Sequence, residues 1–253
     1  MNSIKVRNLT IGEGKPKICV PIVGRTEREI LAQAERIREL PAEIVEWRAD
    51  WFEEVDDFVR VKAVLEKIRQ VLEEVPILFT FRTKGEGGEK EFFEDRYFML
   101  NLEVIRSKNA DLVDVEIFRE ESGVKTIIRE AHACGVKVIA SNHDFEKTPE
   151  KDEMIRRLCK MQTMQADILK IAVMPKSVKD VLTLLTATEE MNREFADRPV
   201  VSMSMGKFGA VSRMSGEIFG SAITFGAAGN TSAPGQIEVA ELKNMLDMIH
   251  KVV

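Results

Sequence analysis

The chain has 253 residues, of which 44% are hydrophobic and 31% charged, so it can bury a large core and is not disordered. Its net charge of -5, and the lack of a tract in which Lys and Arg alternate with aromatic residues, exclude a typical nucleic-acid-binding protein. No apolar run approaches the ~18 residues of a membrane span, and the first residues carry no apolar signal core. We therefore expect a cytoplasmic protein without a membrane partner.

The cysteines point to a reducing compartment. Cys19, Cys134 and Cys159 lie far apart and form no CxxC pair. This spacing indicates neither a disulfide framework nor a cysteine zinc site.

Segments typical of β-strands alternate with helical segments along the chain. The first 14 residues stand outside this alternation, and residues 4–14 (IKVRNLTIGEG) predict a two-strand hairpin. Eight strands are then predicted, at 17–23, 43–50, 76–82, 111–118, 136–143, 167–173, 199–205 and 221–227.

Capping patterns predict where two of the intervening helices begin. Thr26 and Glu29 match a capping box, and the helix that follows would bury Ile30, Ala34 and Ile37. Thr148 followed by a proline predicts a second start, before a helix with Ile155, Leu158, Cys159 and Gln162 at core spacing.

Eight strands alternating with helices predict an α/β fold of the closed (β/α)8 type, the TIM barrel, which typically has ~250 residues. We predict a single domain over residues 1–253, with the hairpin covering the N-terminal end, or bottom, of the barrel. A doubly wound open sheet is the alternative fold.

Polar residues gather late in the predicted strands, at the end where TIM barrels carry their active sites. Alternate residues of a strand point to the same side, so these residues share one face of each strand. If that face points inward, one pocket collects Glu46, Arg48, Arg82, Asp114, Glu116, His143 and Lys170. Each residue alone is more often a solvated side chain or an ion-pair partner. If none of the seven residues were functional, several charges would have to be buried independently at corresponding strand ends, so the set as a whole favours a functional pocket.

Lys170 interrupts the apolar strand 168–173 (ILKIAV), where an unpaired ammonium group costs several kcal/mol. Burial and the cations Arg48 and Arg82 would favour its neutral amine, a nucleophile that forms an imine with a carbonyl substrate. A histidine within reach could then remove a proton from the adjacent carbon. The alternative is that Lys170 only neutralises Asp114 or Glu116.

Other site types are weakly indicated. GEGGEK (85–90) and GKFG (206–209) match neither glycine-rich nucleotide-binding template. Besides His143 the chain has only His132 and His250, both on predicted helices away from the pocket, so we expect no histidine metal site. Carboxylates alone could still bind magnesium.

Two long loops, 205–216 and 226–239, are expected to close the pocket and exclude water. The first offers Arg213 between small residues, and the second has the Gly, Ala, Ser and Pro-Gly composition of a mobile segment. An inert connection to the last helix is the alternative for the second loop.

At these residues the sequence resembles the type I 3-dehydroquinate dehydratases, lyases of the shikimate route to aromatic compounds. The resemblance spans nearly the whole chain. It rests on segments in the same order, namely EWRAD (46–50), FTFR (79–82) with EGGE (86–89), SNHDFEKTP (141–149), KIAVMP (170–175), LTLLTAT (182–188), SMGKFGAVSR (204–213) and SAPGQI (232–237). It implies a (β/α)8 barrel that needs no metal or cofactor and forms a homodimer.

The resemblance also implies residue roles. Lys170 would form a Schiff base with the C3 ketone of 3-dehydroquinate. His143, oriented by Glu86, would remove the C2 proton and then protonate the departing C1 hydroxyl, a syn elimination of water that gives 3-dehydroshikimate. Substrate binding is expected from Glu46, Trp47, Arg48, Arg82, Arg213, Ser232 and Gln236.

One position departs from the family pattern, and two other functions stay open. Several family members have serine at the position of Pro21, whose ring offers no hydroxyl to a substrate. A class I aldolase-like enzyme would also use a Schiff-base lysine, but Arg213 and Gln236 suit a planar carboxylate at least as well as a phosphate. A non-catalytic barrel that binds a polyol acid is the third possibility, and the presence of both Lys170 and His143 counts against it.

Overall fold

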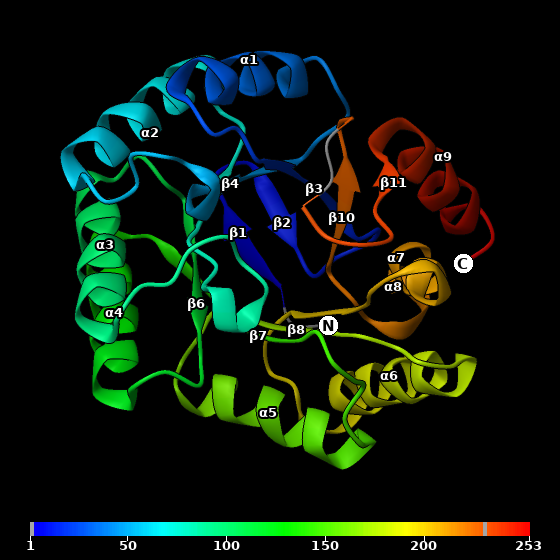
Figure 1. The fold of residues 1–253 in the computed structure, drawn as a ribbon. Coiled ribbons are helices and arrows are strands. Elements are labelled where there is room, and N and C mark those ends of the chain that lie inside the picture. The colour runs from blue at the N-terminus through cyan, green and yellow to red at the C-terminus, as the bar shows by residue number, and fades with distance from the viewer. Residues whose placement is uncertain (1–2, 230–231) are drawn as a thin grey trace.

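The computed structural model describes residues 3–229 and 232–253. Its strands form one curled parallel sheet, and the helices that alternate with them along the chain surround it (Figure 1). The sheet has the order β11-β10-β3-β4-β5-β6-β7-β8-β9. This is the predicted TIM barrel with its N-terminal hairpin.

All eight predicted strands are confirmed, most of them slightly shorter than predicted. They are β3 (Lys17–Ile22), β4 (Ile44–Arg48), β5 (Ile77–Thr80), β6 (Leu112–Glu116), β7 (Lys137–Asp144), β8 (Ile168–Val173), β9 (Val200–Ser204) and β10 (Ile223–Ala227). The hairpin consists of β1 (Ile4–Val6) and β2 (Leu9–Ile11), and a short β11 (Ile237–Glu238) pairs with β10.

The sheet closes between β9 and β10. Among the described residues these strands are joined by a single bridge, between Val200 and Ser221, next to which the Ala222 N–H donates to the Val200 carbonyl over 2.7 Å. On its other side β10 pairs with β3 through a regular parallel ladder. The last strand of the alternation therefore lies between its neighbour and the first strand, which excludes the open doubly wound sheet.

The long helices are α1 (Glu27–Arg38), α2 (Phe58–Leu72), α3 (Glu94–Ser107), α4 (Glu121–Cys134), α5 (Lys151–Thr163), α6 (Val178–Glu190) and α9 (Val239–His250). After β9 the chain forms only the short helices α7 (Ala210–Met214) and α8 (Gly216–Phe219). No helix of the described residues is both long and apolar enough to cross a membrane.

The two capping predictions had different outcomes. Thr26 caps α1, which buries Ile30, Ala34 and Ile37 as predicted. The prediction for α5 was wrong at its start, because the Thr148 hydroxyl donates to the Met174 carbonyl and the helix begins at Lys151. Its buried face is Met154, Ile155, Leu158 and Met161, whereas Cys159 and Gln162 are only partly buried.

Two apolar layers hold the barrel together. The outward faces of the strands pack against the helices, and this layer includes Val45 and Trp47 of β4 and Val113 and Val115 of β6. Inside the barrel the lower layer is made by the early inward residues of the strands, namely Cys19, Ile44, Leu78, Leu112, Ile139, Ile168, Val201 and Ile223. Val6 and Ile11 of the hairpin pack against that inner layer. The hairpin thus covers the N-terminal end, and the other end is left for polar residues.

Candidate active site

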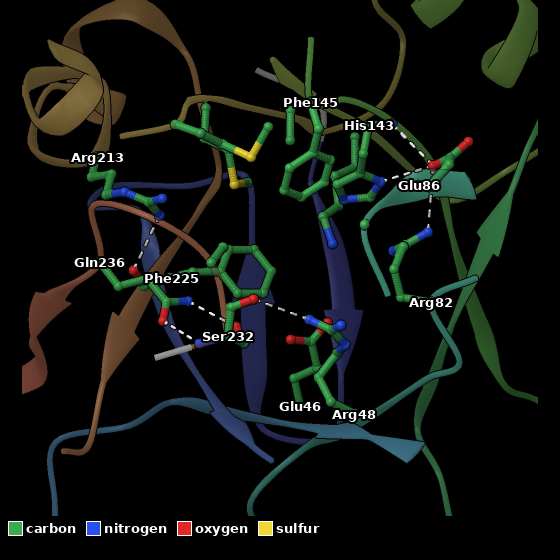
Figure 2. Close-up of a pocket in the computed structure, with 16 residues that line it drawn as sticks. Glu46, Arg48, Arg82, Glu86, His143, Phe145, Arg213, Phe225, Ser232 and Gln236 are labelled. Atoms are coloured by element: carbon green, nitrogen blue, oxygen red, sulfur yellow. Dashed lines mark hydrogen bonds and ion pairs between the residues drawn. The ribbon is translucent and has the colours of Figure 1, made fainter. Parts of the chain in front are cut away.

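The upper interior of the barrel forms a pocket above the inner apolar layer (Figure 2). It is lined by Glu46, Arg48, Arg82, Glu86, Gly87, His143, Phe145, Lys170, Ala172, Met203, Met205, Arg213, Phe225, Ser232, Ala233 and Gln236. Figure 2 shows Arg213 and Gln236 on one side of this pocket and His143, Glu86 and Arg82 on the other. One side of the pocket thus carries a guanidinium and an amide, and the other carries an imidazole, a carboxylate and a second guanidinium.

Lys170 lies in the middle of β8 and is 3% exposed. Its ammonium nitrogen donates to Asp114 Oδ2 over 3.0 Å and lies 4.7 Å from the centre of the Phe225 ring. Both contacts stabilise the buried cation, one by charge and one by the negative face of the ring. The ion pair with Asp114 and a position facing the pocket therefore occur together, so the two interpretations of Lys170 do not exclude each other.

Arg82 is the centre of the charged network. Its guanidinium donates to Asp114 Oδ1 (2.6 Å), to Glu116 Oε1 (3.2 Å) and to the Ser141 hydroxyl (3.0 Å). Burial alone would raise the pKa of Asp114, but the charges of Arg82 and Lys170 hold it well below its ordinary value. Asp114 is therefore ionised at neutral pH, and its two oxygens hold Arg82 and Lys170 in place.

His143 and Glu86 form a hydrogen-bonded pair at the end of β7. His143 Nδ1 lies 2.9 Å from Glu86 Oε2, which also accepts the backbone N–H of His143 over 3.0 Å. Burial lowers the pKa of His143 well below its ordinary value, and the charges of Arg82 and Lys170 lower it further. The imidazole is therefore neutral near pH 7, the form that accepts a proton.

Glu86 reaches His143 because the loop after β5 folds back on itself. A Cβ atom on Gly88 would lie 1.9 Å from the Arg82 carbonyl oxygen, so only glycine fits there. Gly87 has a φ of +85°, and a side chain on it would strike the Phe145 ring. Gly87 and Gly88 of GEGGEK thus serve this close turn beside the pocket. Burial raises the pKa of Glu86 to about 7, although the charge of Arg82 opposes that rise.

Arg48 and Glu46 of β4 are held by partners in other segments, namely the turn after β4, the second loop and β5. Arg48 makes two parallel 2.8 Å hydrogen bonds to Asp50, and its third nitrogen donates to the Ser232 carbonyl over 3.4 Å. Asp50 is fully buried and also accepts the backbone N–H groups of Arg82 (3.3 Å) and Glu89 (3.1 Å).

The Glu46 carboxylate faces the pocket and accepts the Thr80 hydroxyl over 2.8 Å. Both of its oxygens are acceptors, so it can receive hydroxyl groups of a ligand.

Arg213 differs from the other pocket cations because no carboxylate lies within ion-pair distance of it in residues 3–229 and 232–253. It is 1% exposed and donates to the carbonyls of Phe225 (3.4 Å) and Pro234 (3.0 Å), while its Nε lacks a partner among the described residues. Burial lowers its pKa to about 10. A buried guanidinium with free donors is a site for an anion, and its fork matches a carboxylate.

The second predicted loop closes over this side of the pocket. The Gln236 amide accepts the Ser232 N–H over 2.9 Å and donates to the Ser232 hydroxyl over 3.0 Å. The Gly206 N–H donates to the Pro234 carbonyl (3.1 Å), and a side chain on Gly235 would strike the Gly206 carbonyl. The two loops therefore pack directly on each other, as a cover over the site does.

Trp47 is a correction to the sequence prediction of substrate-binding residues. It is fully buried in the outer apolar layer, where the centre of its ring lies 5.6 Å from that of the Phe79 ring and 6.1 Å from that of the Phe52 ring. Trp47 lies between Glu46 and Arg48 on β4, so strand alternation points it away from the pocket. It supports the strand rather than the ligand.

Strand alternation also places Ala172 on the inward face, but the sequence analysis missed the rest of the apolar wall of the pocket, namely Phe145, Met203, Met205, Phe225 and Ala233. Alternation along β9 and β10 could have found Met203, Met205 and Phe225, because they share the inward face with Val201 and Ile223. Phe145 and Ala233 lie in loops and carry no such signal. Among the described residues, no group of three or more His, Cys, Asp or Glu side chains could hold a metal ion.

The fold and the pocket define a TIM-barrel enzyme with a lysine, a neutral histidine and a buried arginine toward the C-terminal ends of its strands. The family model for type I 3-dehydroquinase matches residues 18–252. The chain belongs to this family, and it is a hydro-lyase of the shikimate pathway. That membership decides against an aldolase-like enzyme and against a non-catalytic barrel.

Individual relatives agree over the full length. The chain is 53% identical over 251 residues to a 3-dehydroquinate dehydratase of Listeria innocua, with 99% of each chain covered. A structure of the type I 3-dehydroquinate dehydratase of Clostridium difficile with covalently modified comenic acid matches with a TM-score of 0.98 and 49% identity, and covers 100% of both chains. The 3-dehydroquinate dehydratase of Geobacillus kaustophilus matches with a TM-score of 0.96 and 40% identity, over 99% of this chain and 97% of that one.

Proposed function

We propose that the protein converts 3-dehydroquinate to 3-dehydroshikimate through an imine on Lys170. The observation that carries this proposal is the position of the Lys170 amine in a pocket that also contains a neutral His143 bonded to Glu86. An amine, a base and a carboxylate anchor are the parts that elimination next to a ketone requires.

The Lys170 ammonium would first release a proton, and the resulting amine would attack the C3 ketone. The released proton would then leave with the hydroxyl of the carbinolamine as water, so that a protonated imine remains. This cation withdraws electrons and acidifies C2, so the free nitrogen of His143 can take the C2 proton. The same imidazolium then protonates the C1 hydroxyl, which departs as water. Hydrolysis of the imine releases 3-dehydroshikimate and returns the amine, so the sum of the steps is the loss of one water.

The remaining pocket residues would hold the substrate. Arg213, with free donors and no carboxylate partner among the described residues, would bind the substrate carboxylate. Glu46, Arg48 and Arg82 would bind the ring hydroxyls and neighbouring polar groups. Ser232 and Gln236, which bond to each other in the closing loop, would complete the carboxylate side and exclude water.

Borohydride reduction in the presence of 3-dehydroquinate, followed by mass analysis, tests the imine. We expect a covalent adduct on Lys170, and we expect Lys170→Ala to lose both the adduct and turnover. Lys176→Ala is the matched control, because it removes an exposed lysine charge from the segment after β8. An unmodified Lys170, or normal turnover by Lys170→Ala, contradicts the mechanism, and cleavage fragments in place of a dehydrated ring indicate an aldolase reaction.

We also propose that the enzyme works as a cytoplasmic homodimer without a cofactor. The family resemblance supports the dimer and the lack of a cofactor. Sedimentation velocity tests the dimer, for which we expect a species of twice the 28.6 kDa chain mass. Activity that survives exhaustive dialysis against a chelator supports the lack of a cofactor.

A further inference from the structure

We propose that Asn142 and Arg157, neither of which lines the pocket, are positioning residues that fix the tautomer of His143 through Glu86. This inference rests on the proposed function of His143 as the base. It concerns a chain of hydrogen bonds that runs from helix α5 to the imidazole.

Asn142 is the inner part of this chain. It precedes His143 on β7, is 8% exposed, and its amide nitrogen donates to Glu86 Oε1 over 3.2 Å. The other oxygen of Glu86 faces His143, through the backbone N–H at 3.0 Å and Nδ1 at 2.9 Å. Each carboxylate oxygen therefore receives a donor from a different side chain.

Arg157 is the outer part of the chain. Its Nη1 donates to the Asn142 Oδ1 oxygen over 2.9 Å, and its Nε donates to Glu153 Oε1 over 2.7 Å. A guanidinium has only donors, so the amide must present its oxygen to Arg157 and its NH2 group to Glu86. Arg157 thereby sets the direction of the amide.

The direction of the amide then sets the proton on His143. Because Asn142 donates to Glu86, this carboxyl group is free to be an acceptor at both oxygens, and the hydrogen between Glu86 and the imidazole belongs to Nδ1. Nε2 consequently carries the lone pair, which is the form a general base needs. With the amide reversed, its oxygen would face Glu86 Oε1, and that contact would favour a protonated carboxyl group.

The surrounding charges are consistent with this role but do not replace it. Arg82 lies 3.6 Å from Glu86, and the carboxylates of Asp114 and Glu116 act on it from β6. His143 faces the cations Arg82, Lys170 and Arg48 and the anion Asp114. On the outer side, Arg157 faces Glu153 and lies 4.0 Å from Asp144.

Burial raises the pKa of Glu86 to about 7, and the hydrogen bond from Asn142 is among the contacts that oppose this rise. Loss of that hydrogen bond therefore moves the pKa of Glu86 further upward, and its ionised form becomes scarcer at neutral pH.

The test compares Asn142→Leu, Arg157→Met and the control Arg156→Met. Arg156 and Arg157 are neighbours on α5, and both bond to Glu153. The Arg156 side chain is 63% exposed, and its hydrogen bonds within the described residues go to Glu153, whereas Arg157 also donates to Asn142. The two arginine variants thus remove the same charge from the same helix, and only one of them breaks the chain to His143.

The first readout is the 15N spectrum of the histidine ring nitrogens. The chain has only three histidines, so the His143→Ala spectrum identifies the His143 signals. The spectra are recorded above the pKa of Glu86, which is about 7, so that this carboxyl group is ionised in the wild type. There we expect Nδ1–H in the wild type and in Arg156→Met, and a mixture of tautomers in Asn142→Leu and Arg157→Met. The second readout is kcat/KM, which should fall about 10–100-fold in the two chain-breaking variants, with the acidic limb of the pH profile moved to higher pH.

An unchanged tautomer and pH profile in Asn142→Leu would overturn the proposal. Equal effects of Arg156→Met and Arg157→Met would also overturn it, since the loss of one positive charge from α5 would then explain both effects. Arg157 lies on a surface helix, so Arg157→Met keeps the test decisive if Asn142→Leu does not fold. If the wild type does not turn over 3-dehydroquinate, the proposed function fails, whereas the tautomer comparison still decides this inference.

Discussion

Replacing Arg213 with methionine should raise the stability of the free protein while it abolishes most of the activity. The guanidinium is 1% exposed, and no carboxylate pairs with it in the described part of the chain. Without an anion, this charge is buried at a cost that only carbonyl oxygens offset. Methionine fills similar space without a charge.

The magnitude of the stability effect follows from the burial of the charge. Burial lowers the pKa of Arg213 from 12.5 to about 10, and at ~1.4 kcal/mol per pH unit this corresponds to about 3 kcal/mol. In the variant, the carbonyls of Phe225 and Pro234 lose the hydrogen bonds from Arg213, although Pro234 keeps the one from the Gly206 N–H. This loss destabilises the variant by roughly 1–2 kcal/mol and offsets part of the gain. We expect a net stabilisation of about 1–2 kcal/mol, which raises Tm by a few degrees in a chain of this size.

The effect on activity has the opposite sign. Two charge-assisted hydrogen bonds to a substrate carboxylate, at about 1.5–3 kcal/mol each, correspond to a loss in kcat/KM of roughly a hundredfold or more. Thermal unfolding without ligand measures the first effect, and steady-state kinetics with 3-dehydroquinate measures the second.

Arg213→Lys is the matched control, because it keeps the charge but not the planar fork. It should lose activity without gaining stability. An Arg213→Met variant that is less stable than the wild type, or that keeps its kcat/KM, would refute the assignment of Arg213 as an unpaired anion anchor.

Three further predictions concern His143, Glu86 and Asp114. His143→Ala should still form the borohydride-trapped adduct but lose the elimination step, and near-normal turnover in a kinetic assay would contradict its assignment as base. In the wild type, kcat/KM should fall as the pH drops below about 7. Burial raises the pKa of Glu86 to about 7, and protonation of this carboxyl group removes the acceptor of the His143 Nδ1–H. A pH profile that is flat down to pH 5 would contradict this prediction. Asp114→Asn should lower the free energy of unfolding, measured in urea titrations, by about 3–5 kcal/mol, because it leaves Arg82 and Lys170 buried without their shared anion. A change below about 1 kcal/mol would show that another carboxylate takes the place of Asp114.

The strand pattern determined most of the fold and the inward half of the site. Alternation along the strands places Glu46, Asp114, His143 and Lys170 on one face, and the period of 2 is a local property that needs no tertiary information. The same rule would have kept Trp47 out of the pocket, because it lies between two inward residues on β4. The resemblance to a family added roles that the pattern alone does not assign.

Only the tertiary structure decided which groups meet across long separations. The bonds of Asp114 to Lys170 and of Glu86 to His143 join residues 56 and 57 positions apart, and the direction of the Asn142 amide depends on Arg157 of a helix outside the barrel. The start of α5 was misplaced for the same reason, because Thr148 bonds to the distant Met174 carbonyl in place of capping the helix. Periodicity and capping patterns describe a few consecutive residues. Hydrogen-bond partners of buried polar groups are fixed only when the barrel closes and removes water from them.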